Sequence, residues 1–229
     1  MRRFLAALLL CFAGVVPSAQ AALVTLRATG TVTSVDNSSS LLPVGISGST
    51  IGNAFTIEYS FDSATADVNP SSSVGAYNFG SAFSLTATIG GNSYVLVTNN
   101  GVIGVQDDFL SSGTYYDRYQ VSASQFSGAG EFLSSALIGL FNAGSTAPQP
   151  GLDSQLLPVI GFDPTIFANR SMELRFRQIV SGVLVGEDLI IGTVTSIENV
   201  SAVPLPAAAW LMLSGLGGLG FLGRRRKAA

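Results

Sequence analysis

Three acidic side chains give this sequence a candidate metal site. Asp107 and Asp108 are adjacent, and Asp117 follows nine residues later. Calcium prefers oxygen ligands, and carboxylates gathered by loops supply them. These three residues are therefore candidate calcium ligands. Their spacing matches no recognised calcium-binding loop, so ordinary solvated loop charges are the alternative.

Hydrolysis of a glycosidic bond is a second chemistry open to carboxylates. It needs two of them about 5–10 Å apart across a cleft. The chain has 14 acidic residues, and no spacing among them identifies such a pair. A carboxylate-dependent glycan hydrolase stays open as an alternative, with no catalytic residue assigned.

Aromatic residues around a cation form a third candidate. Tyr115, Tyr116 and Tyr119 lie close to Arg118 in the sequence. Such a group can stack on a sugar, whereas aromatic residues at alternating strand positions usually belong to a core. Both interpretations, a glycan-binding surface and a core contribution, follow from the pattern.

Missing residue types exclude several classes of site. The chain has no histidine, and its one cysteine is Cys11. Catalysis by Ser-His-Asp or Cys-His and zinc sites built from histidine and cysteine are excluded in their usual forms. We expect no cofactor.

The charge of the middle of the chain argues against a nucleic-acid partner. Residues 22–202 contain five arginines, no lysine and all 14 acidic residues, a net charge of −9. Binding to phosphates needs clustered cations, so we expect no nucleic-acid binding.

Short runs of alternating apolar and polar residues fill the middle of the chain. This period of two predicts half-buried strands. The runs are residues 24–35, 54–61, 83–89, 94–98, 119–123, 133–141, 172–179, 183–185 and 189–197. Turn-forming residues separate them, at 36–38, 90–92, 99–101 and 147–151. We expect an all-β fold over residues 22–202, an antiparallel β-sandwich of jelly-roll type, with an open barrel as the alternative.

The N-terminal 21 residues have the pattern of a signal peptide. Two arginines precede 13 apolar residues, 4–16, and Pro17 ends that run. Ala19 and Ala21 form a small-x-small site, which predicts cleavage by signal peptidase before Ala22. The domain that follows is therefore expected to be exported.

The C-terminal segment has the pattern of a single membrane helix. Residues 205–223 carry no charge, and 19 residues of helix reach about 28 Å, close to the hydrocarbon thickness of a bilayer. The basic cluster of Arg224, Arg225, Arg226 and Lys227 should stay in the cytoplasm. A plain membrane anchor is one interpretation of this segment.

Three features in order give a second interpretation. Residues 203–227 hold the motif Val203-Pro204-Leu205-Pro206, then the glycine-rich span, then the basic cluster. This order closely resembles the PEP-CTERM sorting signal of exopolysaccharide-producing Gram-negative bacteria. The resemblance implies that an exosortase, a membrane-embedded transpeptidase of cysteine-protease type, recognises the motif and removes the tail. Leu205 stands where that signal usually has glutamate, so Val-Pro-Leu-Pro looks like a variant of it.

These features together predict how the protein is exported and sorted, and they do not assign a binding or catalytic activity. We expect an exported, noncatalytic cell-surface or extracellular-matrix protein that is anchored transiently and then displayed or released. The resemblance implies a link to exopolysaccharide and biofilm. A glycan-binding module, with or without calcium, and a glycan hydrolase are the alternatives.

Overall fold

A computed structural model describes residues 23–69, 71–96, 100–127 and 132–201 of the chain. It contains ten β-strands and one short 3-10 helix, η1 (Pro164–Ile166). The strands are β1 (Leu23–Asp36), β2 (Ala54–Asp62), β3 (Val74–Gly80), β4 (Ser84–Ile89), β5 (Asn92–Leu96), β6 (Asn100–Ser111), β7 (Thr114–Ser127), β8 (Phe132–Gly144), β9 (Asn169–Val180) and β10 (Val183–Asn199). The expectation of an all-β antiparallel fold is confirmed.

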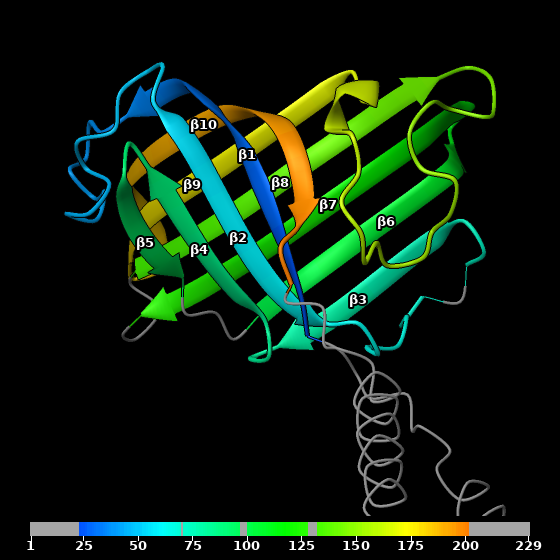
Figure 1. Ribbon diagram of the computed structural model, residues 1–229. Coiled ribbons are helices and arrows are strands. Elements are labelled where there is room, and N and C mark those ends of the chain that lie inside the picture. The colour runs from blue at the N-terminus through cyan, green and yellow to red at the C-terminus, as the bar shows by residue number, and fades with distance from the viewer. Residues whose placement is uncertain (1–22, 70, 97–99, 128–131, 202–229) are drawn as a thin grey trace, which may run out of the picture.

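All ten strands belong to one antiparallel sheet. Its order is β3-β6-β7-β8-β9-β10-β1-β2-β4-β5, so the last strand of the chain lies in the interior of the sheet, next to the first. The sheet curls into a half-barrel, and β1, β2 and β4 cross in front of β6 to β9 (Figure 1). The prediction of a two-sheet sandwich of jelly-roll type is therefore wrong. The alternative, an open barrel, describes the single curled sheet more closely.

The alternation of apolar and polar residues along the strands explains the position of the core. It also explains why a two-sheet sandwich was predicted in place of one curled sheet. On β2, Phe55, Ile57, Tyr59 and Phe61 are buried, and the residues between them are partly exposed. Each strand buries one side in this way, because successive side chains point to opposite faces. A sandwich and a curled sheet need the same alternation, so the pattern does not say how strands divide into sheets.

Two strands were not predicted. β3 is rich in glycine and has a single β-branched residue, and two adjacent acids interrupt the apolar pattern of β6. Of the turn expected at 99–101, residues 100 and 101 form the start of β6. The runs at 183–185 and 189–197 are one strand, β10, with a register shift between Leu184 and Gly186. That irregularity interrupts the alternation and makes one strand look like two.

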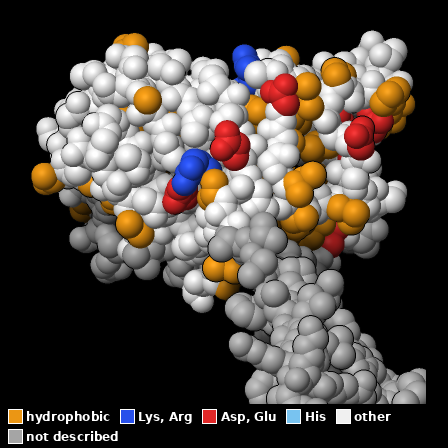
Figure 2. Space-filling model, viewed as in Figure 1, with side chains coloured by type: hydrophobic (Ala, Val, Ile, Leu, Met, Phe, Trp, Pro, Cys, Tyr) orange, Lys and Arg blue, Asp and Glu red, His pale blue; other side chains and the backbone are white. Residues whose placement is uncertain are grey.

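The connection between β8 and β9, residues 145–168, covers part of the core. The ring of Phe162 contacts that of Tyr119 at 5.1 Å between centroids, and its N–H donates to the carbonyl of Ile197 at 3.0 Å. The same connection exposes Leu156 and Ile160. Figure 2 shows apolar side chains gathered on the side of the molecule where this connection lies.

No helix in the described part of the chain is long and apolar enough to cross a membrane. The helix expected over residues 205–223 and the signal peptide over residues 1–21 lie outside the described residues.

Candidate functional site

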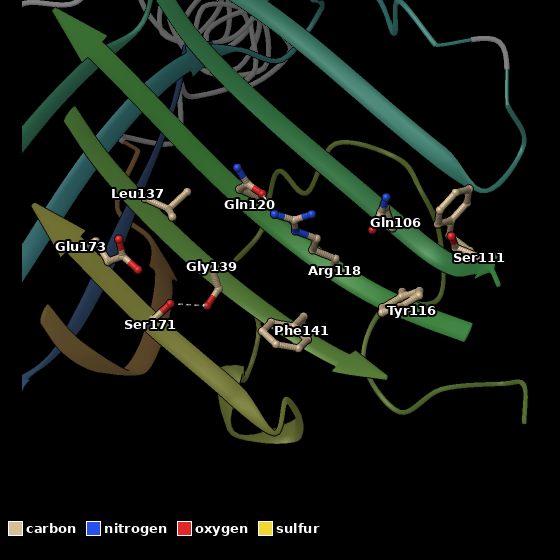
Figure 3. A pocket seen from close by; sticks show the side chains of 11 residues that line it. Gln106, Ser111, Tyr116, Arg118, Gln120, Leu137, Gly139, Phe141, Ser171 and Glu173 are labelled. Carbon is tan, nitrogen blue, oxygen red and sulfur yellow. Dashed lines mark hydrogen bonds between the residues drawn. The ribbon is translucent and has the colours of Figure 1, made fainter. Parts of the chain in front are cut away.

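A groove of about 520 Å³ lies on the outer face of the sheet, across β6, β7, β8 and β9 (Figure 3). Two glycines make room for it. Gly104 and Gly139 both face Gln120 in the strand register, one from β6 and the other from β8. A methyl group added at Gly104 would meet nothing within 4 Å, and one at Gly139 would meet only the Ser171 hydroxyl, at 3.4 Å. The floor is therefore backbone left uncovered by side chains.

Aromatic rings form one end of this outer groove. Phe109 on β6 pairs directly with Tyr116 on β7. Phe141 on β8 pairs with Arg118, so it is the diagonal neighbour of Tyr116 across the two strands. Diagonal neighbours lie close enough for large rings to share one surface. Phe141 is 40% exposed, so its ring is open to a ligand.

Polar side chains line the rest of the outer groove. Gln106 and Arg118 are cross-strand partners, and the Arg118 guanidinium donates to the Gln120 side-chain oxygen. Ser171 and Glu173 close the far end on β9, where Figure 3 shows them on the side away from Tyr116. The outer groove thus combines an aromatic end with a hydrogen-bonding end.

The predicted aromatic group divides between the two faces of β7. Tyr119 is fully buried and belongs to the core. Tyr116 and Arg118 line the outer groove, and Tyr115, one position earlier, points to the opposite face from Tyr116. Tyr119 therefore fits the core interpretation, whereas Tyr116 and Arg118 lie on an exposed groove, where glycan binding stays a prediction. Phe109 and Phe141, which complete the aromatic end, were not singled out, because only the strand register brings them together.

The three candidate calcium ligands lie near one another but have other partners. Asp107 and Asp108 sit at a bulge in β6, where the register shifts between Gln106 and Phe109, and Asp108 has a φ of 48°. The Asp108 carboxylate accepts the Gln149 N–H at 2.7 Å. The fully buried Asp117 carboxylate accepts the N–H of Asp108 at 2.8 Å through one oxygen. Its other oxygen accepts the Leu152 N–H at 3.1 Å. Two of the three carboxylates thus fix the bulge to the β8–β9 connection.

Burial dominates the ionisation of this acidic cluster. It raises the pKa of Asp117, although the N–H groups of Asp108 and Leu152 act in the opposite direction. Burial also raises the pKa of Asp107, and the charges of Asp117, Asp108 and Asp153 raise it further. Among the described residues, no group of three or more acidic, histidine or cysteine side chains is placed to hold a metal ion.

A second buried carboxylate has the same structural role at another loop. Asp188 on β10 is fully buried and accepts the N–H groups of Ser39, at 2.7 Å, and Leu41. These residues begin the long connection between β1 and β2. Nothing in its sequence context distinguishes Asp188 from the exposed acids, because its loop partners are almost 150 residues away.

Most other charges on the outer face form ion pairs. Glu187 contacts both Arg175, at 3.4 Å, and Arg177, and Arg175 also contacts Glu173 at 3.0 Å. The carboxylate that lines the outer groove is therefore already neutralised by a neighbouring arginine.

Comparison with known families gives one match. The family model of the PEP-CTERM protein-sorting motif matches residues 202–227, which confirms the resemblance seen in the sequence. Comparison with curated proteins and with solved structures gives no significant match. A motif of this kind implies export, a C-terminal signal held in the membrane before surface display, and processing by an exosortase-type system.

The sorting residues follow the described domain directly. Ser201 is the last described residue, and its hydroxyl accepts the N–H of Thr25 at 2.6 Å. The motif of Val203, Pro204, Leu205 and Pro206, the basic cluster of residues 224–227, and the cleavage residues Ala19, Ala21 and Ala22 all lie outside the described residues.

Proposed function

We propose that this chain is a noncatalytic cell-surface or extracellular-matrix protein, delivered by an exosortase-type system in an envelope linked to exopolysaccharide and biofilm. The match of residues 202–227 to the sorting motif carries the proposal. In it, the Val203–Pro206 motif is the recognition site, and residues 205–223 hold the chain in the membrane with the basic cluster in the cytoplasm.

The organisation of the domain supports a display role. Its buried acids, Asp117 and Asp188, bind loop backbone, and Glu58, Glu173 and Glu187 bind arginines. These carboxylates therefore stabilise the fold through hydrogen bonds and ion pairs. The outer groove is lined by a single carboxylate, Glu173, whereas a glycan hydrolase of the usual kind needs two.

The sorting proposal is tested by changing Pro204 and Pro206 to alanine in the full chain, expressed in an exosortase-containing host. Unprocessed protein should accumulate in the membrane fraction, because the recognition motif is lost and the span remains. A matched variant changes Pro148 and Pro150, which lie in the β8–β9 connection, and should be processed normally. Equal processing of the Pro204/Pro206 variant and the wild-type chain would refute recognition of the motif.

Two further measurements test cleavage of the signal peptide and anchoring by the C-terminal segment. N-terminal sequencing of the exported protein should begin at Ala22. Deletion of residues 203–229 should release soluble exported protein, recovered outside the membrane fraction. A membrane-held product after that deletion would contradict anchoring by the C-terminal segment.

A glycan-binding role is the second candidate, and the combination of aromatic rings and hydrogen-bonding groups in the outer groove favours it. Catalysis is the competing outcome. Release of reducing ends from a polysaccharide incubated with the purified chain would contradict the noncatalytic assignment.

A further inference from the structure

We propose that the outer groove binds a saccharide segment that carries a carboxylate, a uronic-acid unit, with Tyr116 and Phe141 contacting the sugar ring and Arg118 binding the carboxylate. This inference rests on the glycan-binding candidate proposed above and names its ligand class, and it does not depend on the sorting proposal. The groove belongs to the described domain, whereas the sorting residues lie outside it.

The aromatic end matches the faces of a sugar ring. A pyranose presents C–H groups on a face and hydroxyls around its rim. The negative face of an aromatic ring attracts positively polarised groups, and its area removes apolar surface from water. Phe109, Tyr116 and Phe141 bring such rings together from three adjacent strands. Rings used only for folding would be expected on the buried face, and these line the outer one.

Arg118 gives the outer groove its preference for a carboxylate. In the described part of the domain, the outer-face residues Arg27, Arg175 and Arg177 each form an ion pair with a glutamate, whereas Arg118 contacts the neutral Gln120. A guanidinium can bind a carboxylate through two parallel hydrogen bonds, which a neutral hydroxyl cannot match. Because the surrounding domain is acidic, this exposed cation is a local site of positive charge.

The remaining groups suit sugar hydroxyls. Gln106 and Gln120 each offer a donor and an acceptor, and Ser171 offers a hydroxyl on the far side of the Gly139 backbone. The uncovered backbone at Gly139 lets a flat ring approach closely. The volume of about 520 Å³ falls within the range of ligand sites.

Two other occupants fit less well. A peptide that adds a strand needs free backbone groups at a sheet edge. The outer groove lies over β7 and β8, which are paired on both sides. A polynucleotide would need several cations for its phosphates, and Arg118 is the one cation among the lining residues.

The test uses the full chain, purified in a detergent without a sugar headgroup so that the detergent does not compete. Calorimetry compares a short oligouronate with a neutral oligosaccharide of the same length. The oligouronate should bind at least about tenfold more tightly, and its affinity should fall as salt is added, because the ion pair is partly exposed. Equal affinity for the two oligosaccharides, or no binding of either, would overturn the proposal.

Three variants locate the binding. Tyr116→Ala should weaken oligouronate binding about tenfold or more through lost stacking. Arg118→Gln should remove the preference over the neutral oligosaccharide. Gly139→Val should block the groove floor, and because an added Cβ there contacts only the Ser171 hydroxyl, at 3.4 Å, the fold should stay intact.

Matched controls separate binding from folding. Arg27→Gln removes an outer-face arginine on β1, and Thr56→Val replaces a hydroxyl by a methyl group on the outer face of β2, both away from the groove. Neither control should change affinity, and all five variants should melt as cooperatively as the wild-type chain. Wild-type affinity in the folded Gly139→Val and Tyr116→Ala variants would place binding elsewhere and refute the proposal.

Discussion

The hydroxyl oxygens of Tyr59 and Tyr119 lie 3.0 Å apart, and this hydrogen bond joins β2 to β7 through the interior of the curled sheet. Both side chains are fully buried. Burial raises the pKa of both hydroxyls, so they stay protonated at physiological pH. The pair links two strands that are not neighbours in the sheet.

The effects of removing the Tyr59 and Tyr119 hydroxyls on stability should not be additive. Tyr119→Phe leaves the buried Tyr59 hydroxyl without this partner and should lower the free energy of unfolding by about 1–3 kcal/mol. The double variant with Tyr59→Phe removes both polar groups and should be less destabilised than the sum of the single variants. Denaturant unfolding of the three variants measures the coupling, and simple additivity would contradict the interaction.

Neighbouring acids in the cluster on β6 and β7 should respond in opposite ways to substitution. Asp117→Asn replaces an acceptor oxygen by an amide, which cannot accept both the Asp108 and the Leu152 N–H. A loss of about 1–3 kcal/mol is expected. Asp107→Asn removes a charge that burial, and then its acidic neighbours, disfavour, and should leave stability unchanged or increased. Thermal unfolding compares the two variants, and a larger loss for Asp107→Asn would reverse the assigned roles.

The raised pKa of Asp107 predicts a pH dependence with a definite sign. The folded state holds this proton more tightly than the unfolded state, whose pKa is near the ordinary value of 3.8. Stability from this group is therefore fully present below that value and falls as pH rises through the raised pKa. Unfolding measured from pH 4 upward should show a shallower fall for Asp107→Asn than for the wild-type chain. An identical profile would show that Asp107 does not contribute.

Asp188 should control the order of the β1–β2 connection. Asp188→Ala removes the acceptor for the N–H groups of Ser39 and Leu41, so residues 37–53 should be cut faster in limited proteolysis. Glu198→Ala, at an exposed position on the same strand, is the control and should not change the rate. An unchanged rate in Asp188→Ala would mean that other contacts hold the connection.

The sequence predicted which residues of each strand are buried. It did not predict which strands pair or in what register. The run from Phe55 to Phe61 predicted β2 and its buried face correctly. No local pattern places Gly104 and Gly139 on either side of Gln120, because that depends on which strands pair and in what register. The outer groove therefore could not be found in advance, although two of its members, Tyr116 and Arg118, were noted as a group.

The roles of the acidic residues also depend on contacts with distant parts of the chain, which the sequence did not predict. Asp117 was selected for its neighbours in the sequence, and the structure does bring Asp108 close to it. Its second partner, Leu152, comes from a distant connection, and that contact assigns the carboxylate to loop anchoring. Asp188 has the same role, and its place in the sequence beside Glu187 does not predict that role, because both of its partners are remote.

The position of β10 in the sheet has a consequence for biogenesis. Without it, β9 and β1 have no shared neighbour, and the remaining strands form two unconnected groups, β3-β6-β7-β8-β9 and β1-β2-β4-β5. The half-barrel therefore closes only after nearly the whole domain has been synthesised. Contacts this distant in sequence form slowly, so the sheet as a whole is expected to form late in folding. The sorting motif matches residues 202–227, so the strand that completes the sheet is also the element synthesised immediately before the sorting segment.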